Sequence, residues 1–237
     1  MPLIHTLASY IKGDGEFSGL SGIQADQRDF SPFLVHFTSY MSMEILRRAI
    51  ELEALPKDIH QLLSVADNES MNIVRRISES NSLLSSKPKN KDGTEQQISK
   101  CICFSECNIS GIISHAERYG RFGFIFSKSV LFGLGCRPCL YVDEEIYTII
   151  SKNFSSDDIT TPTGRLYSLA NIYTPPGHGK VQDFTHEREW RLFQDLSFDV
   201  ASPIMLITPS QYASEVSRLF DSVDNIIPLN YLYQMGA

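Results

Sequence analysis

Six short runs of apolar, β-branched and aromatic residues constrain the fold more than any other feature of the sequence. Each run has the length of a buried strand, and turn-forming or polar residues bound it. Segments with helical spacing of apolar residues lie between them in no regular alternation, which favours an α+β fold. The expected strands are Phe33–Phe37, Ile98–Phe104, Gly123–Ser127, Cys139–Val142, Glu189–Phe193 and Pro203–Ile207.

The remaining segments divide the chain into a lead-in and one domain. Residues 1–32 carry several Gly and Asp residues and few periodic apolar positions, so they predict a loop-rich lead-in, and residues 33–237 predict a single domain. Helical spacing runs from Met43 to Leu55 and ends at Pro56. Residues 58–80 predict one or two more helices, and 81–97 are rich in Ser, Lys and Asn, so about 56–98 is expected to be a helical and flexible insertion. Ser210 is expected to cap a helix that reaches Phe220.

Charge and composition exclude several classes of protein. The formal charge of −7 at pH 7 argues against a protein that coats nucleic acid or anionic membrane with its whole surface. The sequence contains no run approaching the roughly 18 apolar residues of a membrane-spanning helix, and its first residues do not resemble a secretory signal. Its 5 cysteines are an odd number, typical of reduced thiols. We therefore expect a cytoplasmic protein with no membrane partner.

Polar residues within or beside the expected strands are the candidates for chemistry. His36 and Thr38 end the first strand, where the sheet fixes the backbone of an imidazole that can donate to a ligand. Ser105 follows the second strand, and the aromatic block from Tyr119 to Phe126, with glycines at 120 and 123, can form a stacking surface. A core histidine and an ordinary aromatic core are the structural alternatives.

The segment Thr185–Phe193 is the most specific of these candidates. If it is a strand throughout, Glu187, Glu189 and Arg191 share one face, and Trp190, the only tryptophan, lies on the other. Carboxylate pairs of this kind occur at active sites, although a salt-bridged surface strand gives the same pattern.

The order of these segments resembles the AbiGi-type abortive phage resistance family and, more distantly, the ADP-ribosyltransferase superfamily that includes bacterial toxins. The resemblance rests on His36-Phe37-Thr38, Phe104-Ser105, the block from Tyr119 to Gly123, and the run from Glu187 to Arg191. It covers residues from about 33 to 232, apart from about 55–98. It implies ADP-ribosyltransferase-like split β-sheets with flanking helices and a cleft between them that binds NAD as a substrate.

The resemblance also implies roles for individual residues. Glu189, with Glu187 as second choice, would stabilise the positive charge that develops when nicotinamide leaves. His36 would hold a ribose of NAD, and Tyr119 would stack on nicotinamide. The implied catalytic residues are therefore Glu189, Glu187 and His36, and the implied NAD-binding residues are His36, Phe37, Thr38, Ser105, Tyr119 and Phe122. Two features depart from the family patterns: a first-strand histidine accompanies a two-glutamate strand, and Tyr119 is expected in a glycine turn.

The function expected from this resemblance is that of a toxin-like effector in antiphage defence by abortive infection, within a toxin-antitoxin system. It would transfer ADP-ribose from NAD to a nucleic acid or protein acceptor, with RNA or DNA preferred. Lysines 87, 89, 91 and 100 would guide such a polyanion. The alternative is a catalytically inactive binding module of the same fold, acting as phage sensor or antitoxin. The other expected partners are an antitoxin or a phage protein.

Two metal-dependent alternatives are compatible with parts of the sequence. Cys103, Cys107, Cys136 and Cys139 could supply four thiolates to a structural zinc ion, although their spacing lacks a second CxxC pair. A magnesium-dependent nuclease needs a larger carboxylate cluster than Glu187 and Glu189 provide. We therefore expect no metal in the function.

Overall fold

The computed structural model describes residues 31–38, 56–88, 95, 98–153, 158–174 and 185–236. The expected helix from Met43 to Leu55 and nearly all of the lead-in at 1–32 lie outside these residues. No helix among the described residues has the length and apolar character needed to cross a membrane.

A seven-stranded mixed sheet forms the centre of the described structure, in the order β11-β10-β4-β1-β3-β8-β5. Only β10 and β11 run parallel; the other neighbours are antiparallel. The strands are β1 (Phe33–Thr38), β3 (Ile102–Ser105), β4 (Phe122–Ser127), β5 (Arg137–Pro138), β8 (Glu189–Leu192), β10 (Met205–Thr208) and β11 (Ile226–Pro228).

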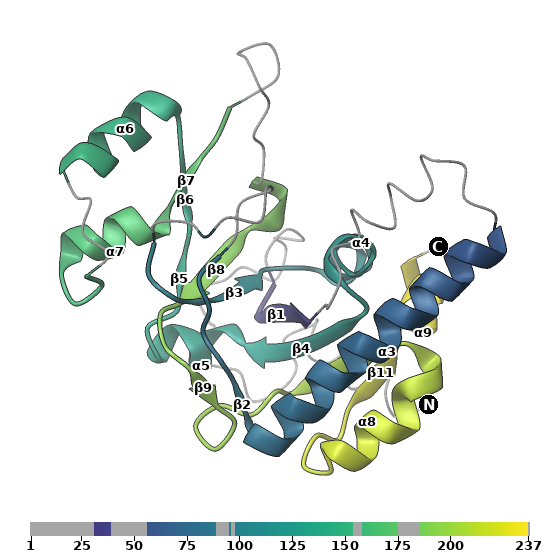
Figure 1. The fold of residues 1–237 in the computed structure, drawn as a ribbon. Helices are drawn as coiled ribbons and strands as arrows, with labels where there is room; N and C mark the ends of the chain where they lie inside the picture. Colours follow the sequence, from purple (N-terminus) through teal and green to yellow (C-terminus); the bar gives the residue numbers. More distant parts are fainter. Residues whose placement is uncertain are drawn as a thin grey trace.

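Helices cover both faces of this sheet (Figure 1). One face packs against α3 (Pro56–Ser80), α5 (Lys128–Gly133) and α8 (Ala213–Leu219), and their apolar side chains form the principal core with Leu34, Phe104 and Phe124. The opposite face packs against α4 (Ile109–Tyr119) and α9 (Leu229–Gly236), and its core includes Val35 and Ile125. We call these the α3 face and the α4 face.

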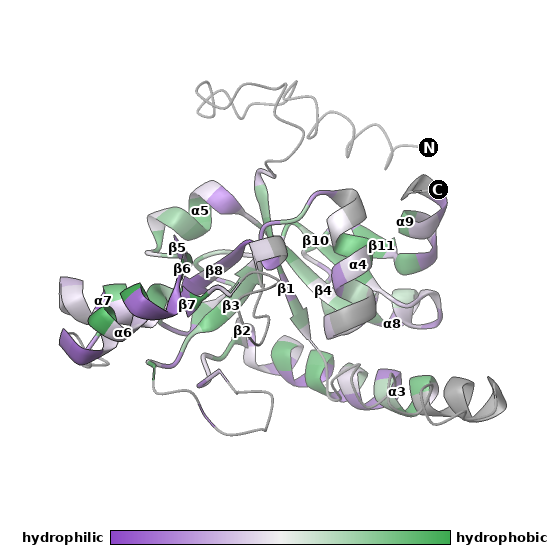
Figure 2. Ribbon diagram, turned by 90° about the horizontal axis from the view of Figure 1, so that it is seen from above, coloured by the Kyte–Doolittle hydropathy of each residue, from purple (hydrophilic) through white to green (hydrophobic). Residues whose placement is uncertain are grey.

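Alternation along the strands assigns each side chain to one of these faces. On β1, Leu34 belongs to the α3 face and Val35 to the α4 face. Gly123 of β4 lies opposite Phe37, and a side chain there would press against Val35, Phe37 and Ile207 of the α4 face. The central strands therefore carry apolar side chains on both sides, and much of their ribbon has the hydrophobic colour in Figure 2.

A smaller lobe adjoins the β8–β5 edge of the sheet, on the side away from α8 and α9 (Figures 1 and 2). It consists of β6 (Leu140–Val142), α6 (Glu144–Asn153), α7 (Pro162–Leu169) and β7 (Ala170–Ile172), with β6 and β7 paired in parallel. Its own apolar cluster is small and is centred on Ile150, Tyr167 and Ala170, with Ile98 added from the chain before β3.

The remaining short elements join the principal parts. β2 (Ser82–Leu83) pairs with β9 (Leu196–Ser197), and two 3-10 turns, η2 (Thr185–Glu187) and η3 (Ser210–Tyr212), precede β8 and α8. Ser210 does not cap α8: its hydroxyl donates to Asn230, and η3 separates it from that helix.

This architecture agrees with the expected α+β class. Residues 56–80 form one continuous helix, and Met71 and Val74 on α3 are fully buried in the principal core. The described part of the expected insertion at about 56–98 thus contributes to the core, because one side of α3 carries the apolar residues that the sheet requires.

Candidate functional site

His36 lies on the α3 face of β1, where its ring contacts Phe104 edge-on at a centroid distance of 5.9 Å. Its Nδ1 is 2.9 Å from the carbonyl oxygen of Cys103. Because a carbonyl only accepts, this contact requires the tautomer that carries the proton on Nδ1. Burial lowers the pKa of His36, against the opposing effect of that hydrogen bond, so the imidazole is neutral at pH 7.

The strand register separates His36 from Glu189. Val35 lies opposite Ser105, and Ser105 lies opposite Glu189, so these three side chains belong to the α4 face. His36 belongs to the other face with Phe104. The expectation that His36 and Glu189 converge on one cleft is therefore not met: the sheet itself lies between them.

Thr38 and Phe122 accompany His36 on the α3 face. They lie opposite each other on β1 and β4, and both are buried. Phe122 packs against Tyr212 within the principal core at a centroid distance of 5.6 Å. Its ring is 1% exposed, so it fills the core and has no free face on which nicotinamide could stack.

The α4 face brings together most of the other predicted residues. Tyr119 is the last residue of α4, contrary to the expected glycine turn, and its hydroxyl donates to a carboxylate oxygen of Glu187. Phe37 stacks on His115 at 6.0 Å, and His115 contacts Tyr119 at 5.5 Å. An aromatic row therefore leads from β1 along α4 to Glu187.

Local sequence explains how α4 holds this row. The side chain of Asn108 caps the helix by accepting from Gly111 N–H at 2.8 Å, and Gly120 ends it with φ 135°. Positions 115 and 119 are one turn apart, so their rings share one side of the helix.

Glu187 and Glu189 do not belong to one continuous strand. Glu187 ends the 3-10 turn η2, Arg188 has a left-handed backbone with φ 42°, and β8 begins at Glu189. The expectation of a strand through 187, 189 and 191 is therefore wrong at its first residue. The turn at Arg188 directs the two carboxylates to different partners: Glu187 to Tyr119 and Glu189 to Arg191.

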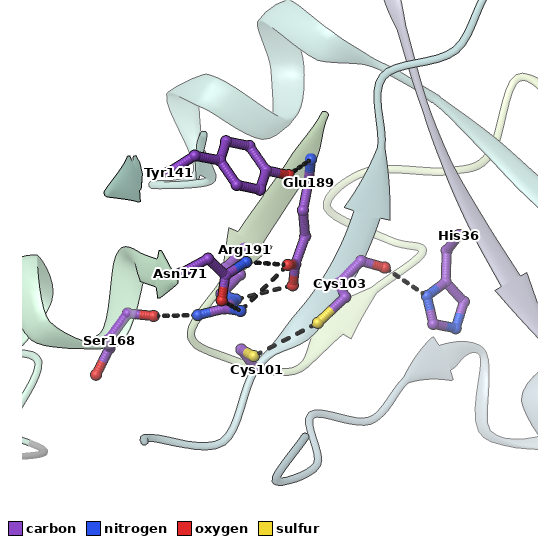
Figure 3. A network of polar contacts seen from close by, with 8 residues as sticks. All are labelled: His36, Cys101, Cys103, Tyr141, Ser168, Asn171, Glu189 and Arg191. Carbon is purple, nitrogen blue, oxygen red and sulfur yellow. Dashed lines mark hydrogen bonds and ion pairs between the residues drawn. The ribbon is translucent and has the colours of Figure 1, made fainter. Parts of the chain in front are cut away.

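Glu189 is the centre of a polar network between β8 and the lobe (Figure 3). Its Oε1 accepts from Arg191 Nε at 2.8 Å, and its Oε2 accepts from Arg191 Nη2 at 3.1 Å and from Asn171 Nδ2 at 2.8 Å. Arg191 also donates to the Ser168 carbonyl at 2.6 Å and to Asn171 Oδ1 at 2.9 Å. The Tyr141 hydroxyl accepts from the Glu189 backbone N–H at 3.1 Å.

This network keeps Glu189 ionised. Burial by itself would raise the pKa of the carboxyl, but the charge of Arg191 and the hydrogen bonds from Arg191, Cys103 and Asn171 outweigh it and lower the pKa. Glu189 is thus a fixed negative charge beside Ser105, which lies opposite it on β3. We define the acidic site as Ser105, Tyr119, Glu187 and Glu189.

The cysteines near this site do not form the zinc centre that their spacing allows. No group of three or more His, Cys, Asp or Glu side chains in the described part of the chain is arranged to hold a metal ion. Cys101, Cys107, Cys136 and Cys139 are buried, which suits small apolar side chains, and Cys103 is partly exposed.

Sequence reasoning missed the residues that hold the acidic site. Asn171 and Tyr141 come from the lobe, and nothing in their local sequence marks them as partners of β8.

Glu106 is a further buried carboxylate, and it accepts from Ser31 N–H at 3.2 Å, Lys128 Nζ at 2.9 Å and Trp190 Nε1 at 3.0 Å. The position of Trp190 between charged residues was the available signal for Glu106, because an indole N–H that is removed from water needs an acceptor.

Comparison with known proteins does not assign this arrangement to a family. No family model matches the chain, and searches of curated proteins and of solved structures gave no match.

Proposed function

We propose that the protein transfers ADP-ribose from NAD to a macromolecule, with the acidic site as the place of reaction and an ADP-ribosyltransferase-like fold around it. The observation that supports this proposal is Glu189, a carboxyl whose pKa is lowered, on the same face of the sheet as the Tyr119–Glu187 pair. Loss of nicotinamide leaves an oxocarbenium-like ribose, and a fixed carboxylate stabilises that cation without reorganising.

The residues of the α4 face have the chemistry that each step needs. The ring of Tyr119 and the aromatic row behind it suit a flat heterocycle, and the Ser105 hydroxyl suits a ribose oxygen. Glu187, held by Tyr119, suits orientation of the acceptor group. His36 has no direct part in this version of the proposal, because it lies on the α3 face.

The biological setting that we propose is antiphage defence, in which a toxin-like effector modifies RNA or DNA in preference to protein. It rests on the resemblance in segment order alone. An antitoxin or a phage component would then be the partner that controls the activity.

The test is incubation of the purified protein with NAD labelled in its adenylate phosphate and with total RNA, DNA or protein as acceptor. We expect label on one acceptor class and release of nicotinamide, with both abolished in Glu189→Gln and Glu187→Gln. Glu144→Gln, an exposed position on α6, is the matched control and keeps full activity. Labelling that persists in both site variants would overturn the assignment.

Because Glu189→Gln also weakens a buried ion pair, thermal unfolding of each variant accompanies the assay. Glu187→Gln separates the two effects, since its amide oxygen still accepts from Tyr119 and no ion pair with Arg191 is lost. A folded Glu187→Gln protein without activity supports a chemical role for that carboxylate.

One observation favours a second candidate, a binding module without catalysis. Both carboxylate oxygens of Glu189 already accept from Arg191 and Asn171 within the chain, as in a structural ion pair. Such a module would act as phage sensor or antitoxin. Thermal stabilisation by millimolar NAD separates the two, because a ligand at a hundred times its Kd adds about 2.7 kcal/mol. No shift and no nicotinamide release would favour the module.

A further inference from the structure

Cys101 and Cys103 bring two thiols together where the chain enters β3. Their sulfur atoms are 3.8 Å apart, within hydrogen-bonding distance for sulfur. Cys101 is fixed by a pair of backbone hydrogen bonds with Ser86, at 2.9 and 3.1 Å, and Cys103 by its place opposite Arg191 on β8. Backbone pairing thus fixes the main chain of both cysteines, and their side chains lie on the same side of it with the sulfur atoms in contact.

The surroundings distinguish Cys101 from the other cysteines. The hydrogen bond from Cys103 lowers the pKa of the Cys101 thiol, burial opposes this effect, and the charge of Arg191 supports it. Burial raises the pKa of Cys107 and of Cys136 to about 12, and it raises that of Cys139 further. Cys101 is therefore the cysteine of this group whose pKa is lowered, and a thiol donor lies next to it.

We propose that Cys101 and Cys103 form a redox-active dithiol that hydrogen peroxide converts into a reversible intrachain disulfide. The Cys101 thiolate attacks the peroxide oxygen, the O–O bond breaks, and the departing hydroxide takes up a proton to leave as water. The sulfur of Cys103 then attacks the resulting sulfenic acid. The S–S bond forms as the S–O bond breaks, and hydroxide leaves with the Cys103 proton as a second water, so two thiols are oxidised and one peroxide is reduced.

Access and strain both favour a reversible modification. Cys103 is partly exposed and Cys101 is buried, so a small oxidant would have to enter from the side of Cys103. Residues two apart on a strand have Cα atoms about 6.6 to 6.8 Å apart, which is the upper limit for a disulfide. A bond closed at that limit is strained, and strained disulfides are the readily reduced ones.

The modification has a direct effect on the acidic site, although the proposal does not depend on the proposed function. Cys101 and Glu189 share the single proton of Cys103 as acceptors, and its hydrogen bond to Glu189 helps to lower the pKa of that carboxyl. The disulfide consumes the only proton of Cys103, so Glu189 loses this donor on oxidation.

The test treats the folded protein with hydrogen peroxide, blocks the remaining thiols with N-ethylmaleimide in denaturant so that buried Cys107 also reacts, and maps tryptic peptides by mass spectrometry. Cys101, Cys103 and Cys107 fall in one peptide, because trypsin cleaves after Lys100 and Arg118. We expect that peptide to lose the mass of two hydrogen atoms and to carry one maleimide, on Cys107. Dithiothreitol is expected to restore three maleimide sites.

Three variants make the result decisive. Cys107→Ser is the matched control and still forms the disulfide, whereas Cys101→Ser and Cys103→Ser do not. Circular dichroism establishes that each variant is folded. A disulfide to Cys136 or Cys139, or maleimide on both Cys101 and Cys103 after peroxide treatment, would overturn the proposal.

Discussion

Glu189 and Arg191 meet in a two-bond ion pair on the α4 face of β8, with Nε to Oε1 at 2.8 Å and Nη2 to Oε2 at 3.1 Å. The pair is almost fully removed from water, since the two side chains are 12% and 2% exposed. The guanidinium also donates to the lobe, from Nη1 to the Ser168 carbonyl and from Nη2 to Asn171 Oδ1. A pair of this kind costs desolvation when it forms, and its removal from one side leaves an uncompensated charge.

Arg191→Met is therefore expected to destabilise the protein by about 3 to 5 kcal/mol, since it leaves Glu189 buried without its counter-ion. Urea unfolding of the wild type and the variant measures the difference. Arg75→Met is the control: its pair with Glu215 is 42% and 33% exposed, and exposed pairs contribute about 1 kcal/mol or less. Equal losses in the two variants would contradict the structural role of the buried pair.

His36 predicts a pH dependence of stability below neutral pH. Its pKa is lowered in the folded state, so the unfolded chain binds the proton more readily. The contribution of neutral His36 to the free energy of unfolding is therefore fully present above the unfolded pKa of about 6.5. This contribution is lost as pH falls below about 6.5 toward the pKa of the folded state. His36→Asn keeps a donor toward Cys103 and removes this titration.

The measurement is the free energy of unfolding of both proteins between about pH 5 and pH 7.5. We expect the wild type to lose stability relative to His36→Asn as pH falls, by at most about 1.4 kcal/mol per pH unit. Parallel curves over the whole range would show that His36 titrates normally.

Gly164 near the start of α7 has no room for a side chain. A Cβ there would overlap the carbonyl oxygen of Asp158 and press on the Thr161 hydroxyl that caps the helix. Gly164→Ala is expected to cost about 1 to 3 kcal/mol. Gly133→Ala, at the end of α5 with open space around the new Cβ, is expected to gain about 0.5 to 1 kcal/mol. Thermal unfolding of the two variants measures the expected loss of stability in the first and the expected gain in the second.

The hydroxyl of Tyr119 stabilises the turn before β8 through Glu187. Tyr119→Phe is expected to cost about 1 kcal/mol, and the loss should vanish when Glu187→Ala is already present. A double-mutant cycle by urea unfolding measures this coupling. Tyr231→Phe, at a residue that is 56% exposed, is the control and is expected to change stability by less than about 0.5 kcal/mol. Additive losses in the cycle would contradict the hydrogen bond.

Most of the strands were predictable because their signal is local. The run Phe33–Phe37 became β1 with one residue added, and Gly123–Ser127 became β4 with one residue added at its start. The β8 and β10 segments were found within two residues of their ends. Apolar, β-branched and aromatic side chains mark β1, β4 and β10, and charged residues that alternate with Trp190 and Leu192 mark β8.

The composition of the site was less predictable, since it depends on register. Whether His36 and Glu189 share a face is decided by Val35 opposite Ser105 and Ser105 opposite Glu189, and a shift of one residue in either pairing would reverse the answer. Asn171 and Tyr141 reach Glu189 from the lobe, and only long-range packing brings them there. Nothing in the sequence indicates the left-handed backbone of Arg188, because arginine rarely adopts that conformation.

The lobe has too few apolar residues to persist on its own, so its attachment determines its lifetime. Arg191 and Glu189 together hold the lobe to β8, through Ser168, Asn171 and Tyr141. If these contacts are lost, we expect the lobe to open before the central sheet, so that amide hydrogen exchange speeds up in β6 and β7 ahead of β1 and β4.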